Sequence, residues 1–344
     1  MTIINGFELD NIKYIENDIK NAIKNNKPID EKLHMVICVS NAVQYASRYI
    51  LAKKFIKRIE EEEKNVILYI VELAYDLPNK KPQEFYVTDI NNRRHLQLRT
   101  SVPLWHKENL LNICIQKLLP KNWKAVCWAD ADIIFDDPNF AINTLKILNG
   151  CRDIVQNFSH CIDMDQHKNA MNIFSGFGYQ YTHKKPYNFI SNPQNQYHPG
   201  FVWSCTRTAY DKMKGLFEYG ILGSGDHHMC LAWIHNGIKS VNKNATDDYK
   251  NAVFEYQQRC NGLKIGYVPG IISHEFHGKK SNRFYNERWN ILINNKYAPS
   301  IHVTKNKDGL LIPSDQCPQE LLTQIYNYFS IRKEDENFLE NKIT

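Results

Sequence analysis

The sequence predicts an α/β protein with a Rossmann-like sheet that is mainly parallel and flanked by helices. Residues 34–39 and 65–71 are short apolar runs rich in β-branched side chains, and an amphipathic segment separates them. A strand, a helix and a strand in this order form a right-handed βαβ unit, which makes the two strands parallel. The same alternation returns later, with an apolar run at residues 125–129, a helical segment at 138–148 and a strand candidate at 153–160.

The first third of the chain supplies the expected βαβ unit. Residues 1–34 are polar and charged, and we interpret them as an N-terminal extension. Ser40 and Asn41 provide helix-capping chemistry before the amphipathic segment, which ends in the charged run 60–64. Glu72 follows the second strand and is expected at its carboxyl end. The apolar residues expected on one stripe of the helix are Tyr45, Tyr49, Ala52, Ile56 and Ile59.

Further elements are expected downstream. After a turn-rich stretch, a short strand is expected at residues 85–88, and a helix begins near Trp105 and ends at Pro120. Asp137 and Pro138 suit the N-cap and the first residue of the next helix. The remaining predicted elements are a strand and a helix within residues 198–213, a helix at 226–236, a strand at 265–272 and a helix at 319–329.

Two carboxylates follow the strand at residues 125–129. The side chains of Asp130 and Asp132 are expected to point to the same side, so two hard oxygen ligands converge beyond the sheet edge. Mg²⁺ and Mn²⁺ leave coordination positions open for phosphate oxygens, and open α/β sheets bind ligands in this place. A plainer interpretation is that both residues only cap and solubilise the strand end. A second D-x-D, Asp163 and Asp165, is followed by polar residues and is expected in a loop.

Three more stretches carry candidate functional residues, and each has a plainer explanation. Residues 169–198 show no clear period and keep several aromatic side chains, which either cover a ligand or seal the core. Asp226 lies next to Gly225 and is either a helix cap or a general base. The loop at residues 274–288 gathers histidines, lysines and arginines, which suit either a pyrophosphate site or a solvated surface.

Composition and motifs argue against several classes of protein. The chain has 344 residues, 43% of them hydrophobic, which is enough for a sizeable core. Its nine cysteines are scattered and never form C-x-x-C, which argues against a disulfide framework and a zinc ribbon. Because the sequence has neither a signal-peptide pattern nor an apolar run of about 20 residues, we expect no membrane span and a cytoplasmic location. A net charge of +6 without a basic patch favours an anionic small molecule over nucleic acid.

Several blocks of the sequence point to a known family. They are VEL (71–73), RHLQLRT (94–100), LWHKENLLN (104–112), WADADIIF (128–135), HPGFVWS (198–204), GSGDHHMCLA (223–232) and HGKKSNRFYNER (277–288). In these blocks the chain resembles the GT-A fold glycosyltransferases, and more closely glycosyltransferases of bacteria, phages and large DNA viruses. The resemblance implies a GT-A fold with a mixed, mainly parallel sheet, a catalytic domain at residues 35–295 and a helical extension at 296–344 that packs on it. If the source is viral, the expected location is the host cytoplasm.

The resemblance also implies an activity. It implies a hexosyl- or N-acetylhexosaminyltransferase that uses Mn²⁺ or Mg²⁺. The donor would be a nucleotide-diphosphate sugar, usually UDP-linked, and the acceptor a glycan or protein hydroxyl. Asp226 matches the position that deprotonates the acceptor in inverting members. Related inverting enzymes often have several acidic residues in this turn, whereas this chain has Gly-Asp-His-His, so the base and the stereochemical outcome stay open.

The other site residues are implied by the same resemblance, position by position. Asp132 and His277 would bind the metal, and Asp130 would bind the metal or the sugar portion of the donor. The residues implied to bind the remainder of the donor are Glu72 at the nucleoside, Arg99 and Lys107 in matching blocks, and Lys279, Lys280 and Arg283 at the diphosphate.

Three other classes of protein share part of this pattern. A phosphatase of the haloacid dehalogenase type also places D-x-D after a strand, but Ile134 and the mid-chain position of the motif argue against it. A sugar nucleotidyltransferase should show a glycine-rich loop after the first strand, and the segment VSNAVQYASR lacks glycine. A non-catalytic nucleotide- or glycan-binding protein on the same fold is the third alternative.

Overall fold

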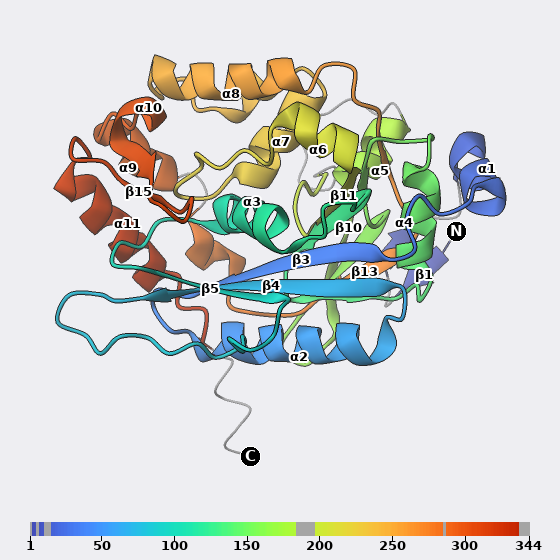
Figure 1. Ribbon diagram of the computed structural model, residues 1–344, viewed down its shortest axis with the longest axis horizontal. Helices are drawn as coiled ribbons and strands as arrows, with labels where there is room; N and C mark the ends of the chain where they lie inside the picture. Colours follow the sequence, from blue (N-terminus) through green and yellow to red (C-terminus); the bar gives the residue numbers. More distant parts are fainter. Residues whose placement is uncertain (1, 5–6, 10–14, 184–196, 285–286, 337–344) are drawn as a thin grey trace.

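A seven-stranded sheet runs through the centre of the fold (Figure 1). The computed structural model describes residues 2–4, 7–9, 15–183, 197–284 and 287–336. Across the sheet the strands are β12 (Ile265–Tyr267), β8 (Ile154–Gln156), β11 (Val202–Thr206), β6 (Ala125–Ala129), β3 (Leu33–Ser40), β4 (Val66–Tyr75) and β5 (His95–Thr100). Strand β11 is antiparallel to both of its neighbours, and the other neighbours in this sheet pair parallel. The predicted α/β fold with a mixed, mainly parallel sheet is confirmed.

The sheet changes its winding direction between β3 and β6, which lie side by side. From β3 the chain adds β4 and β5 toward one edge, returns to place β6 on the other side of β3, and then builds toward the opposite edge. In doubly wound sheets such a switch leaves a crevice outside the carboxyl ends of the two strands, where ligands bind. Here those ends are Ser40 and Ala129.

Helices cover both faces of the sheet, with α3 and α2 on opposite sides in Figure 1. Successive side chains of a strand point to opposite faces, so along β3 Val36 packs into one core and Met35 and Ile37 into the other. The first core includes residues of α3 (Lys107–Leu118), α6 (Arg207–Met213), α7 (Gly225–Trp233), α8 (Asp247–Arg259) and α11 (Gln319–Ile331). The second includes residues of α1 (Asn17–Asn25), α2 (Ala46–Glu62) and α4 (Phe140–Leu148).

A smaller, four-stranded sheet lies beside the switch and was not predicted. Its order is β10 (Ala170–Ser175), β9 (His160–Met164), β13 (Ile271–His274) and β7 (Ile133–Phe135). Strand β7 follows β6 after a short turn, and it pairs antiparallel with β13 so that Ile133 lies opposite His274. This register brings the turn after β6 next to the end of β13.

The remaining elements are shorter. They are β1 (Thr2–Ile4), β2 (Phe7–Leu9), α5 (Phe177–Thr182), η2 (Gly237–Ser240), η3 (Lys280–Arg283), α9 (Arg288–Asn294), α10 (Pro299–His302), β14 (Val303–Lys305) and β15 (Leu311–Pro313). Helix α1 packs on α4, and α11 packs on α9. The division of the chain at residues 34 and 295 stays a prediction.

Several predicted boundaries differ from the structure around β4. The strand continues to Tyr75, so Glu72 lies inside it rather than at its end. Burial of the charged side chain is possible because the Glu72 carboxylate accepts hydrogen bonds from the backbone N–H groups of residues 86–88. Those N–H groups therefore have no need of a strand partner, and the strand expected at residues 85–88 is absent. The next strand is instead β5, which the sequence pattern did not reveal.

Other corrections concern helix starts and split strands. Helix α4 begins at Phe140 with Asn139 as its N-cap, so Asp137 lies before the cap. The residues buried along α2 are Ser47, Leu51, Ala52, Phe55 and Ile59, a stripe displaced from the predicted one. The strands predicted at 153–160 and 265–272 each divide in two, because the chain leaves the large sheet and enters the small one: β8 then β9, and β12 then β13.

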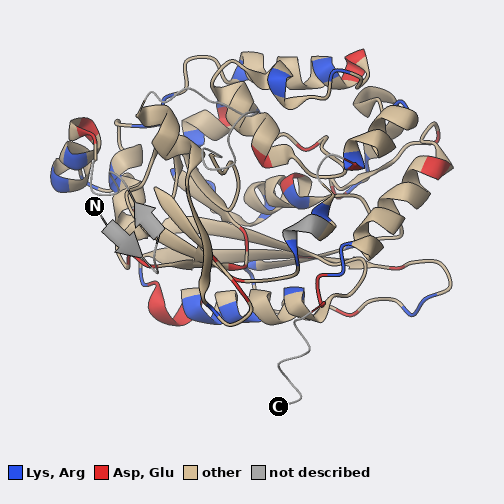
Figure 2. Ribbon diagram, turned by 180° about the vertical axis from the view of Figure 1, so that it is seen from behind, with Lys and Arg blue, Asp and Glu red and all other residues tan. Residues whose placement is uncertain are grey.

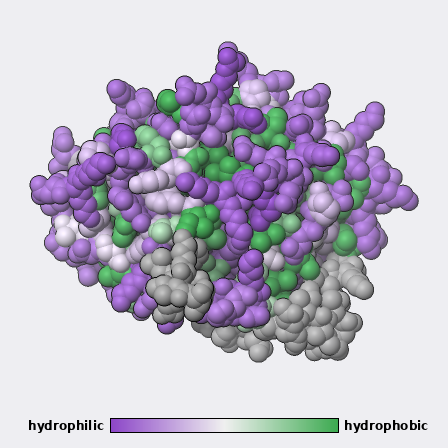
Figure 3. Space-filling model, turned by 90° about the horizontal axis from the view of Figure 1, so that it is seen from below, coloured by the Kyte–Doolittle hydropathy of each residue, from purple (hydrophilic) through white to green (hydrophobic). Residues whose placement is uncertain are grey.

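Charge and hydropathy are mixed over the surface. On the face shown in Figure 2, basic and acidic residues are spread over helices and loops. The face in Figure 3 is mostly hydrophilic, with hydrophobic side chains in small separate groups. Within the described residues, no helix is both long and apolar enough to cross a membrane.

Gly178 offers a test of the packing between α5 and β12. A Cβ atom at this position would lie 2.2 Å from the carbonyl oxygen of Gly266, which is backbone and cannot rotate aside. We expect Gly178→Ala to lower the free energy of unfolding by about 1–3 kcal/mol, the usual cost of overpacking, as measured by urea denaturation. Tyr181→Ala, on the exposed side of the same helix, should change it by less than about 0.5 kcal/mol. Equal losses in the two variants would contradict this packing.

Candidate active site

A cavity of about 970 Å³ opens at the switch point of the large sheet. Its walls come from the end of β3, the first turns of α2, α3 and α7, the turn after β6, the loop after β13 and the last turns of α11. The volume lies within the range typical of small-molecule sites. Six of the predicted site residues line this cavity: Lys107, Asp130, Asp132, Asp226, His277 and Arg283.

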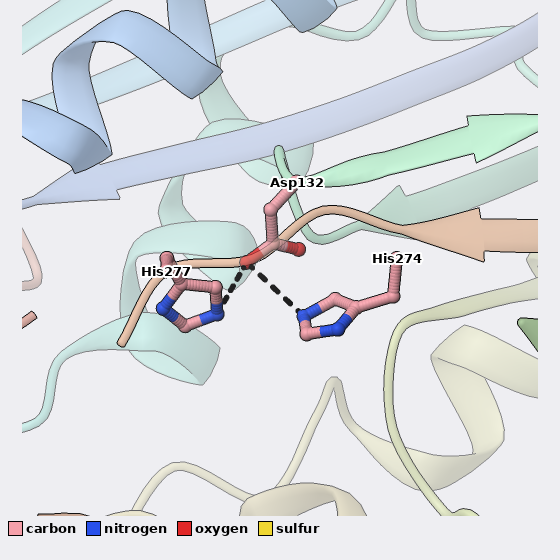
Figure 4. A group of neighbouring side chains, drawn as sticks. All are labelled: Asp132, His274 and His277. Atoms are coloured by element: carbon pink, nitrogen blue, oxygen red, sulfur yellow. Dashed lines mark ion pairs between the residues drawn. The ribbon is translucent and has the colours of Figure 1, made fainter. Parts of the chain in front are cut away.

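Asp132, His274 and His277 meet at one side of the cavity (Figure 4). Their candidate ligand atoms lie within 4.8 Å of one another. Asp132 Oδ2 is 3.0 Å from His277 Nε2 and 3.7 Å from His274 Nε2. The pairing of β7 with β13 explains the meeting, because it places the turn that carries Asp132 beside the strand end that carries His274.

The donor atoms of this group fit a divalent cation. Asp132 Oδ1 is buried and has no hydrogen-bond partner among the described residues, and a buried carboxylate oxygen without a partner is costly unless a cation or donor reaches it. His274 Nδ1 is 2.7 Å from Asp163 Oδ1 in a buried pair. A carboxylate on the far ring nitrogen fixes the tautomer of a ligating histidine and directs its other nitrogen to the metal.

Electrostatics favour the cation-binding forms of Asp132 and His277, which are an ionised carboxylate and a neutral imidazole. Burial raises the pKa of Asp132, but the two imidazoles outweigh burial and hold that pKa well below its ordinary value. Burial lowers the pKa of His277, which favours the neutral ring. For His274, burial lowers the pKa and the carboxylates of Asp132 and Asp163 raise it, with a net increase.

Asp130 does not join this group. Strand β6 ends at Ala129 and the chain turns at residues 131–132, so the two aspartates of the D-x-D do not extend in register as expected. Asp130 Oδ1 instead lies 2.6 Å from Lys107 Nζ. Burial raises the pKa of Asp130 to about 6, although the ammonium of Lys107 acts in the opposite direction.

Lys107 lies between two carboxylates of the cavity wall, those of Asp130 and Asp226. Its Nζ also lies 3.2 Å from Oδ2 of Asp226, the second residue of α7. Burial lowers the pKa of Lys107, but Asp130 and Asp226 raise it to well above the ordinary value. Helix α7 begins at Gly225 with Ser224 as its N-cap, so the capping interpretation of Asp226 is wrong. The Asp226 side chain faces the cavity and Lys107 instead.

Arg283 is the predicted diphosphate ligand that reaches the cavity. Its Nη2 lies 3.0 Å from His277 Nε2, so the guanidinium stands beside Asp132, His274 and His277, the candidate metal-ligand group. Lys279 is exposed and does not contribute to the cavity wall described above. The side chain of Lys280 lies outside the described residues.

Glu72 and Arg99 lie away from the cavity wall. The Glu72 carboxylate is buried and binds the backbone of residues 86–88 and the hydroxyl of Thr88. Arg99 Nη1 is 2.7 Å from Asp76 Oδ1, and its guanidinium stacks over the ring of Phe85. These contacts give both residues a role in holding the loop between β4 and β5.

Three residues in or next to this group of side chains were not predicted as site residues from the sequence. His274 was noted only as part of a cationic loop, although its i, i+3 spacing from His277 was a usable signal. Asp163 was expected in a loop, but it lies in β9 and its buried carboxylate backs His274. Glu334, which lies near His277 Nδ1, comes from a segment to which no function was given. No local pattern reveals the last two, because each meets its histidine only through tertiary structure.

No protein-family model and no curated protein matches the chain. Among solved structures, the chain is similar to a Drosophila β1,4-galactosyltransferase 7 mutant in complex with manganese, UDP-Gal and xylobiose. The sequence identity is 9%, the match covers 85% of this chain and 98% of that chain, and the TM-score is 0.38. It is also similar to mouse xyloside xylosyltransferase 1 in its apo form, with 13% identity, coverage of 71% and 97%, and a TM-score of 0.30. Likeness at this level does not establish an activity for this chain.

The buried carboxyl group of Glu108 should make the stability of the folded protein depend on pH. Burial, together with the nearby Asp226 carboxylate, raises its pKa from the ordinary 4.5 to about 8. Between these values the folded protein keeps a proton that the unfolded chain loses, so the free energy of unfolding should fall as pH rises through this window. Each unit of pKa difference corresponds to about 1.4 kcal/mol.

Glu108→Gln removes this titration without changing the shape of the side chain. The free energy of unfolding of both proteins is measured by urea denaturation at about pH 5 and about pH 8, with chelator present. From the lower to the higher pH, the wild type should lose more than about 1 kcal/mol of this free energy beyond any loss in the variant. Parallel stability curves for the two proteins would show that Glu108 is not held protonated by the fold.

Proposed function

We propose that the protein is a metal-dependent glycosyltransferase. It transfers a sugar from a nucleotide-diphosphate sugar to an acceptor hydroxyl on a glycan or protein, and the family resemblance favours UDP as the nucleotide. The proposal rests on one observation: a candidate metal-binding group and a candidate general base line the same cavity at the switch point. The Asp132, His274 and His277 group lies on one side, and Asp226 lies on another.

Asp132, His274 and His277 are the residues that hold the divalent cation in this proposal. When bound, the cation supplies neutralisation of the negative charge that develops on the departing diphosphate. Of the two ions implied by the family resemblance, Mn²⁺ is favoured, because imidazoles bind transition-metal ions more readily than Mg²⁺, which prefers oxygen ligands. Arg283, beside His277, is placed to contact the same diphosphate, and the exposed Lys279 stays a proposal for that role.

Asp226 is the general base if the reaction inverts the anomeric carbon. The acceptor oxygen forms a bond to that carbon and its proton passes to the Asp226 carboxylate. The bond between the anomeric carbon and the phosphate oxygen breaks, and its electron pair leaves with the nucleoside diphosphate. Lys107 fixes the Asp226 carboxylate in place through the 3.2 Å contact. Aromatic side chains in the cavity wall, Phe174, Tyr197 and Trp289, offer faces for an acceptor sugar.

A panel of nucleotide sugars tests the function. The protein is incubated with each donor and Mn²⁺, and the phosphorus-containing products are identified by ³¹P NMR. Release of a nucleoside diphosphate supports the proposal, since slow hydrolysis of the correct donor occurs even without the acceptor. A separate incubation with a nucleoside triphosphate and a sugar 1-phosphate tests the rival activity, because release of inorganic pyrophosphate there would indicate a nucleotidyltransferase. Binding without turnover of any donor, with or without candidate acceptors, would favour a non-catalytic binding protein.

The metal assignment predicts a loss of affinity in Asp132→Asn. The Kd for Mn²⁺ should rise about tenfold or more by titration calorimetry, because one anionic ligand is removed, while the melting temperature changes little because the side chain lines a cavity. Asp165→Asn is the matched control from the second D-x-D. The Asp165 carboxylate binds backbone N–H groups of its own turn, so this variant should bind Mn²⁺ as the wild type does. Equal affinity in Asp132→Asn would contradict the metal assignment.

If Asp226 is the general base, Asp226→Asn should lower the rate of sugar transfer and leave metal binding unchanged. General-base removal typically lowers the rate by about 10²–10⁴-fold, and we expect a loss of this size in turnover with the identified donor and acceptor. The Kd for Mn²⁺ should stay unchanged, because Asp226 lies outside the group of ligand atoms. Near-normal turnover in this variant would assign the base to another residue or show that none is needed.

A further inference from the structure

We infer that Glu334 is a positioning residue of the metal site, which orients His277 as Asp163 orients His274. The inference rests on the proposed metal site, and it makes residues 328–336 a working part of that site rather than an extension packed on a catalytic domain.

Both histidines of the metal-ligand group have a buried carboxylate on their far side. His274 presents Nε2 to Asp132 and Nδ1 to Asp163, at 2.7 Å. His277 has a related but looser arrangement: its Nε2 faces Asp132, and its Nδ1 lies 3.9 Å from Glu334 Oε2, which is ion-pair distance and longer than a hydrogen bond. A carboxylate near Nδ1 favours the tautomer with its proton on that nitrogen, so that Nε2 carries the lone pair. In His277 that lone pair faces Arg283 Nη2 at 3.0 Å, and a bound metal would take the place of this contact.

Glu334 is fixed strongly enough to orient another side chain. It is 2% exposed. Its Oε2 lies 2.5 Å from Arg48 Nε, and its Oε1 lies 2.8 Å from Arg48 Nη2 in a two-point contact. Arg332 Nε approaches Oε1 to 2.8 Å as an ion pair. A buried carboxylate held at both oxygens has little freedom to move, so its negative charge stays at the His277 side of the cavity.

The backbone around Glu334 is also tied to the loop that carries His277. Gly278 has a φ of +91°, and a Cβ there would lie 3.0 Å from the Cα of Glu334. The hydroxyl of Tyr328 donates to the carbonyl of Arg283 at 2.9 Å. Because Gly278 directly follows His277, this close approach fixes the distance between the ligand and the carboxylate.

The neighbouring residue Asp335 serves a different purpose and supplies a control. Its two carboxylate oxygens accept hydrogen bonds from the N–H groups of Ala46 and Ser47, at 2.8 and 2.9 Å, and so cap the start of α2. Glu334 and Asp335 therefore belong to one segment, but only Glu334 reaches a residue of the metal-ligand group. The rival explanation is that Glu334 merely neutralises Arg48 and Arg332, which would affect stability and leave metal binding unchanged.

The test compares metal binding in wild-type, Glu334→Gln and Asp335→Ala proteins. The Kd for Mn²⁺ is measured by calorimetry, and the visible absorption spectrum is recorded at saturating Co²⁺, which reports ligand geometry rather than stability. We expect Glu334→Gln to raise the Kd for Mn²⁺ by about 10–100-fold, as for other outer carboxylates of metal-bound histidines, and to alter the Co²⁺ spectrum. Asp335→Ala should lower the melting temperature and leave both readouts unchanged.

Glu334→Asp keeps the charge and shortens the side chain. It should give a Kd between those of the wild type and Glu334→Gln, and it replaces that variant if Glu334→Gln does not fold. If the folded Glu334 variants bind Mn²⁺ with wild-type affinity and show an unchanged Co²⁺ spectrum, the role given to Glu334 is overturned and the proposed metal site is not affected. A wild-type protein that binds neither ion would overturn the proposed metal site, and the inference with it.

Discussion

The antiparallel pairing of β7 with β13 is the constraint on which the site depends. It places His274 opposite Ile133, one residue after Asp132, and so joins the turn at the switch point to a strand that follows more than 130 residues later. Neither strand belongs to the large sheet. The large sheet creates the crevice, as doubly wound sheets do, whereas β13 of the small sheet and the loop after it bring His274 and His277 to it. The same small sheet contains β9 and therefore also delivers Asp163.

Buried charge is the second organising feature, and it is balanced locally. Lys107 lies between Asp130 and Asp226, Glu334 lies between Arg48 and Arg332, and Asp132 lies between two histidines. The pair of Glu334 and Arg332 is the most deeply buried of these, with 2% and 6% exposure, and removing one member of such a pair is strongly destabilising because the other charge stays without compensation. The cavity therefore presents charges that their partners already hold in place, and such preorganised groups interact more strongly with a bound ligand than freely moving ones do.

Most strands of the large sheet could be predicted from the sequence because they are local apolar runs, whereas β5 could not, because its sequence HLQLRT is largely polar. Residues 34–39, 66–71 and 125–129 all belong to such strands. Asp132, His277 and Asp226 could be selected because a motif or a family resemblance singled them out. The small sheet could not be predicted, since β7 and β13 have three and four residues and show no period. Glu72 shows the opposite failure: its carboxylate suggested a site, yet it serves to hold a loop.

The most direct test of the account is the position of a bound metal ion. Crystals of the wild-type protein soaked with Mn²⁺ would be examined by anomalous diffraction. The account predicts a peak between the carboxylate of Asp132 and the Nε2 atoms of His274 and His277, at coordination distances of about 2.0–2.4 Å. A peak at another group of acidic residues, or none at this position while Mn²⁺ is bound in solution, would contradict it.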